Sequence, residues 1–127
     1  MTKLLLVDDD EELCAELAQV LEAEGFEVDM AFDGLRGVQC LQEKSYHLII
    51  LDLKLPRLDG YGVLKEIRKT AQPVKVLVLS GKPLGGPLFK EEKTLIMADA
   101  VMNKPFIVQE LLQQIQALTL PVVEKNQ

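Results

Sequence analysis

The sequence predicts an α/β domain built around a doubly wound, five-stranded parallel sheet. Short apolar segments alternate with segments of helical periodicity along nearly the whole chain, as in five consecutive βα units. Three of the apolar segments are almost continuously apolar, which is typical of strands that helices cover on both faces. With 127 residues, the chain is long enough for one such domain and too short for two.

The first half of the chain holds two complete βα units. Strands are expected at 3–7, where the sequence is KLLLV, and at 27–32, where it is EVDMAF. Between and after them, apolar residues recur at helical spacing, and Gly25 is expected to end the first helix. The apolar stripe of the first helix consists of Leu13, Leu17, Val20 and Leu21. That of the second consists of Leu35, Val38 and Leu41.

The second half continues the alternation. Strands are expected at 47–52, 74–80 and 98–103. The segment PRLDG at 56–60 predicts a turn that starts the third helix, with Asp59 as its cap. The stripe of the third helix consists of Val63, Leu64 and Ile67, and that of the last helix of Val108, Leu111, Leu112, Ile115 and Leu118.

The connection at 80–97 is the exception to this regular pattern. Its sequence, SGKPLGGPLFKEEKTLIM, opens with glycines and prolines that disfavour a helix start. We therefore expect a long loop there, followed by a short helix near 88–97. The domain is expected to span 1–120, with 121–127 as a C-terminal tail or the start of a linker.

Composition and charge exclude several classes of function. A net charge of −6 argues against a nucleic-acid-binding surface, because phosphates attract clustered Lys and Arg. No apolar run approaches the roughly 20 residues that span a bilayer, and the N-terminus lacks the layout of a signal peptide. We therefore expect a cytoplasmic protein without a membrane segment. Cys14 and Cys40 lack metal-like spacing and are expected to be reduced core residues, whereas His47 is expected at the surface.

Acidic residues gather where two predicted strands end. In a doubly wound sheet the ligand site lies beyond the carboxyl ends of the strands, where the strand order reverses. Asp8 and Asp9 follow the first strand, and Asp52 ends the third. If the strand order is 2-1-3-4-5, these strands are neighbours and the three carboxylates converge on one crevice. A cation would offset their repulsion, and Mg²⁺ prefers such hard oxygen ligands.

Other residues at the same edge of the predicted sheet help to distinguish a functional site from a solvated corner. Three aspartates before a helix are often only a cap and a solvated corner, and Asp10 is expected to cap the first helix in this way. Ser80, however, ends the fourth strand and Lys104 ends the fifth. A hydroxyl and an ammonium group at the edge that holds the carboxylates favour a functional site over a solvated corner.

The motifs resemble the receiver domains of two-component response regulators, such as those of the chemotaxis type. They are LLLVDDDEEL, LIILDLKLPRLDGYGVLKEIRK, VLVLSG and NKPF, in this order and spacing, over about residues 3–118. The resemblance implies a flavodoxin-like fold with strand order 2-1-3-4-5 and a cis peptide bond at Lys104–Pro105. It also implies a domain that is not an enzyme toward external substrates but promotes its own Mg²⁺-dependent phosphorylation and dephosphorylation.

Roles are carried over by resemblance to matching positions. Asp52 matches the phospho-acceptor, and Asp8 and Asp9 match the acidic pair that organises Mg²⁺. Ser80 matches the hydroxyl residue that hydrogen-bonds a phosphoryl oxygen, and Lys104 matches the lysine that offsets its charge.

Two further lysines each lie two residues beyond one of these positions, Lys54 after Asp52 and Lys82 after Ser80. The backbone carbonyl of Lys54 matches the position that completes the metal shell. The side chains of Lys54 and Lys82 match positions over the phosphoryl group. There they could pair with its oxygens or obstruct the water that hydrolyses it, or instead point to solvent.

The resemblance also implies partners. The phosphoryl donor would be a sensor histidine kinase, as in a phosphorelay, and the read-out would run through the surface around 81–103 and the last helix. An output domain or downstream protein, and a homodimer, are compatible with the resemblance.

The chain departs from the pattern of this family on the read-out side. Val101 stands where the family usually has Tyr, Phe or His, and a valine cannot move between buried and exposed positions as an aromatic ring does. The segment 81–88, rich in Gly and Pro, is therefore expected to switch by becoming ordered. These departures keep open the alternative of a receiver-fold interaction module that works without phosphorylation.

Two enzymatic alternatives fit less well. A phosphatase of the haloacid dehalogenase type would need a second acid two residues after its nucleophile, where this chain has Lys54. A P-loop nucleotide binder would need an upstream glycine and a Ser or Thr in place of Pro83.

Overall fold

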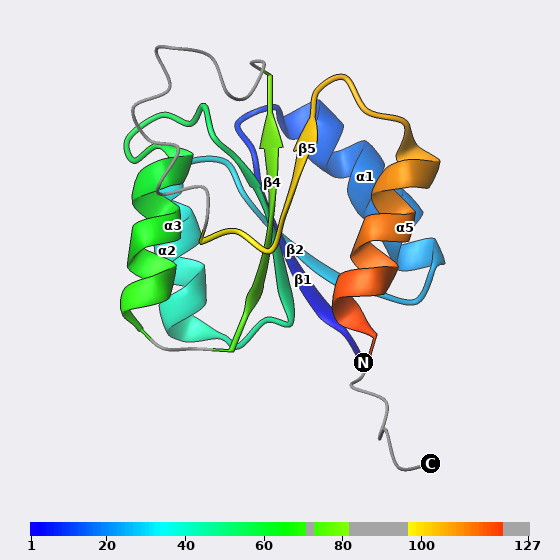
Figure 1. The fold of residues 1–127 in the computed structure, drawn as a ribbon, viewed down its shortest axis with the longest axis horizontal. Helices are drawn as coiled ribbons and strands as arrows, with labels where there is room; N and C mark the ends of the chain where they lie inside the picture. Colours follow the sequence, from blue (N-terminus) through cyan, green and yellow to red (C-terminus); the bar gives the residue numbers. More distant parts are fainter. Residues whose placement is uncertain (71–72, 82–96, 121–127) are drawn as a thin grey trace.

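The computed structural model describes residues 1–70, 73–81 and 97–120. These ranges hold five strands and four helices, which alternate along the chain as far as β4 (Figure 1). The strands are β1 (Lys3–Val7), β2 (Glu27–Ala31), β3 (Leu48–Asp52), β4 (Lys75–Ser80) and β5 (Ala100–Asn103). The helices are α1 (Glu11–Ala23), α2 (Gly34–Glu43), α3 (Gly60–Lys69) and α5 (Val108–Thr119).

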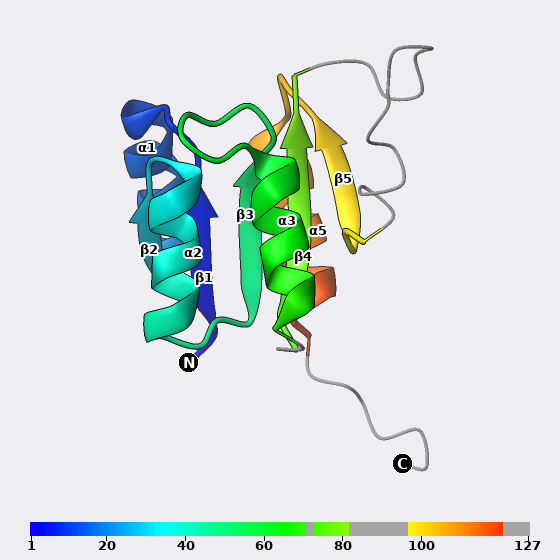
Figure 2. The ribbon, with the colours of Figure 1, turned by 90° about the vertical axis from the view of Figure 1, so that its left-hand side faces the viewer.

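All five strands are parallel, in the order β2-β1-β3-β4-β5 (Figure 2). The order reverses at β1, which pairs with β2 on one side and β3 on the other. Helices α2 and α3 cover one face of the sheet, and α1 and α5 cover the other (Figure 1). The predicted fold class and strand order are therefore confirmed.

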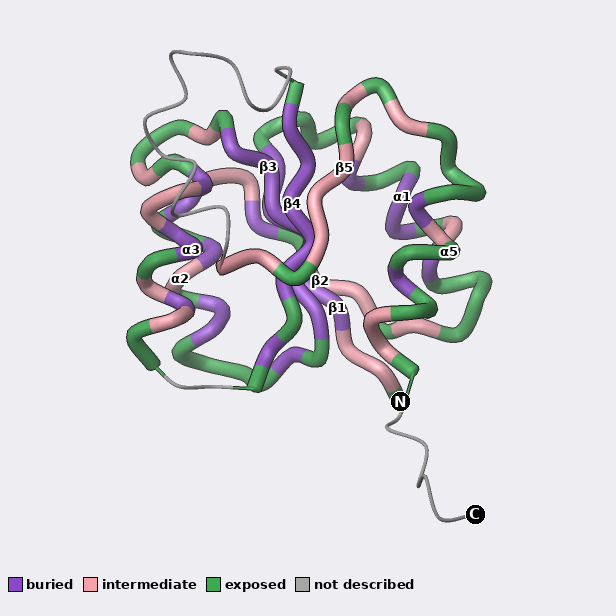
Figure 3. Tube along the Cα trace, in the orientation of Figure 1, coloured by how far each residue is buried: buried purple, intermediate pink, exposed green. Residues whose placement is uncertain are grey.

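The core forms one layer on each face of the sheet. Successive residues of a strand point to opposite faces, so Leu4 and Leu6 of β1 pack with α1 and α5, while Leu5 and Val7 pack with α2 and α3. Strands β1, β3 and β4 are almost entirely buried, as Figure 3 shows along their tubes. Burial on both faces explains why these segments lack the polar alternation of a half-exposed strand.

Local interactions set the helix ends. Asp10 caps α1 by accepting a hydrogen bond from Leu13 N, and Asp59 caps α3 by accepting one from Gly62 N, as predicted. Gly25 has a φ of 95°, and the hydrogen bonds from Gly25 N to Glu22 O and from Phe26 N to Leu21 O form a Schellman motif. The predicted end of the first helix is confirmed.

Two residues of the predicted apolar stripes are exposed. Leu35 of α2 is 46% exposed, because Gly34 and Gly37 face the inside of the fold and turn its side chain outward. Val108, in the first turn of α5, is 41% exposed, and the helix instead buries Leu111 and its neighbour one turn later. Both predictions were wrong, because apolar periodicity does not fix how a helix is rotated about its axis.

The predicted strand limits agree with the structure to within two residues, and the largest difference is at β5, which begins at Ala100 instead of residue 98. The predicted loop at 81–88 and the short helix near 88–97 lie almost entirely outside the described residues. The tail at 121–127 lies wholly outside them, so the division of the chain at residue 120 stays a prediction.

Both cysteines are free and buried, as predicted, and they pack on opposite faces of the sheet. His47 is exposed, also as predicted. Within the described part of the chain, no helix is both long and apolar enough to cross a membrane.

Candidate functional site

Three carboxylates meet where β1 and β3 end. Asp52 is the last residue of β3, and Asp8 and Asp9 follow β1 directly. Because these strands are paired in register, Val7 beside Leu51, their ends bring the acidic side chains to one place. One oxygen of each carboxylate lies within 4.8 Å of the others. Asp8 and Asp52 are buried, whereas Asp9 is exposed, so the cluster opens to solvent on the side of Asp9.

Lys104 joins the cluster from the end of β5. Its backbone N donates to Ser80 O at 2.7 Å, and the Lys104–Pro105 peptide bond is cis, as the resemblance implied. Its ammonium Nζ lies 2.7 Å from Asp8 Oδ2 and 3.4 Å from Asp52 Oδ2. One cation therefore bridges the two buried carboxylates, which come from different strands.

Backbone amides hold the other oxygens of the same carboxylates. Asp10 N donates to Asp8 Oδ1 at 3.0 Å, and Lys54 N donates to Asp52 Oδ1 at 3.3 Å. Each buried carboxylate thus has one oxygen on a backbone amide and one on Lys104. These contacts fix both side chains before any ligand arrives.

The protonation of the site follows from burial and charge. Burial, and then the negative charge of Asp8, raise the pKa of Asp52, while Lys104 partly opposes the shift. Burial disfavours the charged form of Lys104, but the hydrogen bond to Asp8 and the charges of both carboxylates outweigh it and raise the lysine pKa. Lys104 therefore stays a cation and partly offsets two anions.

Ser80 completes the described site. It is 2% exposed at the end of β4, where it pairs with Asn103 next to Lys104. Lys54 is exposed two residues after Asp52. Lys82 lies outside the described residues, so the idea that both lysine side chains act on the phosphoryl group stays untested.

Val101 lies in the middle of β5 and is partly buried against the core layer of α2 and α3. It therefore serves as a packing residue in this structure.

Two features of the site surroundings carried no sequence signal. Cys14 lies beneath Asp8 and directs its Sγ at Asp8 O, 3.5 Å away. Burial, and then the charge of Asp8, raise the pKa of Cys14 to about 12, so it is a neutral thiol at physiological pH. Arg57 has a φ of 70°, in a tight turn closed by a hydrogen bond from Leu58 N to Pro56 O. A non-glycine residue in this region is uncommon, and residue types alone do not predict it.

The donor set fits a hard divalent cation. The closely grouped atoms of Asp8, Asp9 and Asp52 are all carboxylate oxygens, with no soft sulfur or imidazole donor among the three. Mg²⁺ binds through one or two carboxylates and keeps several waters, which suits a cluster with one exposed member. The carboxylates also carry more negative charge than Lys104 alone offsets.

Residues 4–116 match the response regulator receiver domain. The chain therefore belongs to this family, and the predicted resemblance is confirmed. It is similar to a transcriptional regulatory protein, the CpxR homolog of Haemophilus influenzae, at 44% identity over 119 residues, which are 93% of this chain and 50% of that protein. It is also similar to the response regulator ArlR of Staphylococcus saprophyticus, at 32% identity, over 99% of this chain and 56% of that protein.

The solved structures agree with this placement. The response regulator TrrA of Thermotoga maritima, in complex with Mg²⁺ and BeF, aligns with a TM-score of 0.81 and 29% identity, over 93% of this chain and 99% of that one. A CheY-like receiver domain of Methanospirillum hungatei aligns with a TM-score of 0.84 and 27% identity, over 92% of both chains. The chain spans about half the length of the CpxR homolog and ArlR but nearly all of TrrA.

Proposed function

We propose that the chain is a signalling switch in which Asp52 accepts a phosphoryl group in a Mg²⁺-dependent reaction. The observation that carries the proposal is the position of Asp52, buried at a strand end with Lys104 Nζ 3.4 Å away and two more carboxylates beside it. A lone surface aspartate would have neither a counter-charge nor a fixed orientation. Membership of the receiver family supports the same reading.

Asp8, Asp9 and Asp52 would hold the metal through carboxylate oxygens, and Lys54 through its backbone carbonyl. When bound, Mg²⁺ supplies positive charge that offsets the phosphoryl oxygens and orients the displacement. The 4.8 Å grouping of the three carboxylate oxygens supports this assignment.

In the proposed reaction, a carboxylate oxygen of Asp52 forms a bond to phosphorus while the bond from phosphorus to the donor breaks. With a phosphohistidine donor, the imidazole leaves with the electron pair of the P–N bond. Lys104 lies close enough to Asp52 for its ammonium group to pair with the negatively charged phosphoryl oxygens. Ser80 would donate its hydroxyl hydrogen to one of these oxygens. The dianionic product differs in charge from the carboxylate it replaces, and this difference is the signal.

The donor is proposed to be a sensor histidine kinase, and the read-out surface to include the residues around 81–103 and the last helix. The CpxR homolog is a transcriptional regulator about twice as long as the match. An output domain after the receiver, and a homodimer of the active form, are proposed on this basis. Direct nucleic-acid binding by this domain is not proposed, since its net charge is −6.

Intact-mass measurement of the purified chain with acetyl phosphate tests the proposal. We expect a gain of one phosphoryl group with Mg²⁺, little gain with EDTA, and none in an Asp52→Asn variant. Asp59→Asn is the matched control, because Asp59 caps α3 outside the carboxylate cluster, and it should be phosphorylated like the unchanged chain. If Mg²⁺ binds and neither acetyl phosphate nor a histidine kinase adds a phosphoryl group, the chain is an interaction module.

A further inference from the structure

The connection between β2 and α2 contacts both segments that carry the proposed metal ligands. At its start, Ala31 O accepts a hydrogen bond from Asp8 N at 3.1 Å. At its end, Gly34 N donates to Pro56 O at 3.3 Å, in the connection between β3 and α3. Figure 2 shows this second connection passing beside the start of α2. Residues 31–34 therefore link the segment that follows β1 to the segment that follows β3.

The link to the second segment is a close contact between two backbones, and only a glycine fits there. A Cβ atom on Gly34 would overlap Leu58 O and lie 2.6 Å from Leu58 C. Both are backbone atoms, so the start of α2 or the connection to α3 would have to move. Arg57 Nε also lies 4.0 Å from Asp33 Oδ2, a loose ion pair that joins the same two connections. The small size of Gly34 therefore sets how near the connection after β3 comes to α2.

The connection between β3 and α3 carries one proposed ligand, the backbone carbonyl of Lys54. The hydrogen bond from Gly60 N to Leu53 O, 2.8 Å long, joins the two ends of this connection, and its middle rests on Gly34. A backbone carbonyl cannot rotate apart from its chain, so its position depends on where the chain is held. Lys54 N also donates to Asp52 Oδ1 at 3.3 Å, so a shift of the connection would move that carboxylate as well.

We propose that residues 31–34 form a brace that sets the spacing between the two halves of the metal site, with Gly34 as the residue that makes the site select Mg²⁺ over larger cations. One half follows β1 and the other follows β3. Mg²⁺ requires ligands at about 2.0 to 2.1 Å, whereas Ca²⁺ accepts about 2.3 to 2.6 Å and a looser geometry. A brace that keeps the halves close therefore favours the smaller ion. This inference rests on the proposed function, from which it takes the metal ligands.

Metal affinities of a Gly34→Ala variant, measured by isothermal titration calorimetry, test the brace. The dissociation constant for Mg²⁺ should rise about tenfold or more, and that for Ca²⁺ by a smaller factor, so that the preference for Mg²⁺ falls. Gly37→Ala, on the same helix, is the matched control, because its Cβ would meet only the methyl groups of Val7, at 3.1 and 3.3 Å. It should leave both constants nearly unchanged. An equal loss of both ions in Gly34→Ala, or equal effects of the two variants, would overturn the proposal.

Amide hydrogen exchange in the unchanged chain tests the brace even if Gly34→Ala does not fold. If the brace favours the metal, the metal must favour the closed brace by the same factor. Saturating Mg²⁺ should therefore slow exchange of the Gly34 amide about tenfold. The Lys44 amide, which donates to Cys40 O at the other end of α2, should be slowed much less. Equal slowing at both amides, or none at Gly34, would contradict the brace.

Neither measurement requires phosphorylation, so failure of the brace and failure of the proposed function can be distinguished. If Gly34→Ala loses its preference for Mg²⁺ and the unchanged chain is never phosphorylated, the brace holds and the function fails. If Mg²⁺ supports phosphorylation of the unchanged chain but does not slow exchange at Gly34, the brace fails and the function holds. An unchanged chain that binds no Mg²⁺ would overturn both.

Discussion

Lys104 is the residue on which the electrostatics of the site depend. It contacts Asp8 and Asp52 at 2.7 and 3.4 Å, while both carboxylates are at least 90% removed from solvent. Buried charges are tolerated when they are paired, and removal of one partner leaves the other without compensation. The lysine therefore stabilises the fold as well as taking part in the proposed chemistry.

Replacement of Lys104 by Met should lower the free energy of unfolding by about 2 kcal/mol at neutral pH without metal, because two buried carboxylates lose their cation. Mg²⁺ should restore part of the loss by binding the folded state. Urea unfolding with and without Mg²⁺ measures both effects. Lys69→Met, at an exposed pair on α3, should change stability by less than about 0.5 kcal/mol. An equal loss in both variants would contradict this account.

Asp29 and Tyr46 form a second polar contact, away from the site. The Tyr46 hydroxyl donates to Asp29 Oδ2 at 2.6 Å, and Lys44 lies 3.3 Å from the same oxygen. The hydrogen bond from Tyr46 is the main cause that lowers the pKa of Asp29. Since the folded state favours the ionised form, the contact stabilises the fold above the unfolded pKa and loses this effect as the pH falls.

Tyr46→Phe should therefore cost about 1 kcal/mol of stability at pH 7. The cost should shrink as the pH falls below about 4, where Asp29 becomes protonated in the unfolded and then in the folded chain. Chemical denaturation at a series of pH values measures this dependence. With Asp29→Asn already present, the Tyr46 change should lose its pH dependence, and a cost independent of pH in the otherwise unchanged chain would contradict the mechanism.

At this scale, residue type and position predicted which side chains lie close together, while their roles stay a prediction. Asp8, Asp52, Ser80 and Lys104 all occur at strand ends, and parallel strands bring their ends together. The contact of Tyr46 with Asp29 could not be predicted in this way. It joins residues of common type, 17 positions apart, whose meeting depends on how β2 lies beside the segment before β3.

At the scale of elements, the connection between β3 and α3 holds Asp52 in place. Gly60 N donates to Leu53 O at 2.8 Å, which brings the start of α3 against the end of β3. A Cβ atom on Gly60 would lie 2.5 Å from both Asp52 O and Leu53 Cα. Both are backbone atoms, so the helix start or the strand end would have to move.

Gly60→Ala should destabilise the domain by about 1 to 3 kcal/mol and slow phosphorylation, because it displaces the backbone of the proposed acceptor. Gly62→Ala is a milder control, since its Cβ would meet the movable end of the Leu58 side chain. Thermal unfolding and the rate of mass gain with acetyl phosphate are the measurements. Normal stability and rate in Gly60→Ala would show that this close approach is unimportant.

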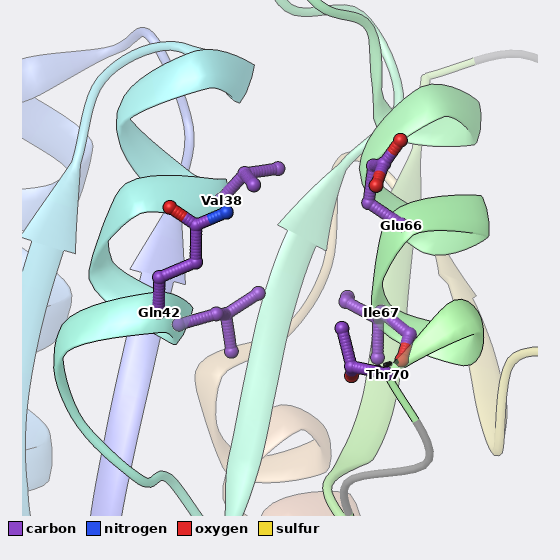
Figure 4. A pocket seen from close by; sticks show the side chains of 6 residues that line it. Val38, Gln42, Glu66, Ile67 and Thr70 are labelled. Carbon is purple, nitrogen blue, oxygen red and sulfur yellow. Dashed lines mark hydrogen bonds between the residues drawn. The ribbon is translucent and has the colours of Figure 1, made fainter.

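Between α2 and α3 there is a small void of about 50 Å³ that is partly open to solvent, since the exposed residues Gln42 and Thr70 line it (Figure 4). Val38 and Gln42 of α2 face Glu66, Ile67 and Thr70 of α3 across it. The void lacks the van der Waals contacts that a filled core would make.

Val38→Ile should raise stability by about 0.5 to 1 kcal/mol, because one more methylene can enter the void. Val20→Ile, at a partly buried valine of α1 that does not line this void, is the matched control and should bring less gain. Urea midpoints compare the two variants. A larger gain at Val20 than at Val38 would contradict the prediction.

The elements themselves were largely predictable, because apolar periodicity reports which faces are buried. The failures at Leu35 and Val108 have one cause. Periodicity shows that a face exists but not how the helix is rotated about its axis, and Gly34 and Gly37 set that rotation in α2. A glycine contributes no apolar signal to the pattern. Periodicity therefore predicted Leu35 on the buried face of α2, where Gly34 and Gly37 lie instead.

At the scale of the whole molecule, topology creates the site. The order β2-β1-β3-β4-β5 places the ends of β1 and β3 side by side and those of β4 and β5 next to them. Residues as far apart as Asp8 and Lys104 therefore meet. The motifs predicted this arrangement because their order and spacing fit one known topology, whereas composition and periodicity alone predicted only an α/β class.

The central claim is that Asp52, among these neighbouring carboxylates, carries the phosphoryl group. Borohydride reduction of the phosphorylated chain, followed by peptide mass mapping, tests it most directly, since reduction converts an aspartyl phosphate to homoserine and releases phosphate. The account predicts homoserine at position 52 after treatment with acetyl phosphate and Mg²⁺, and none without the metal. Homoserine at position 8 or 9, or a phosphorylated chain with unmodified Asp52, would contradict the account.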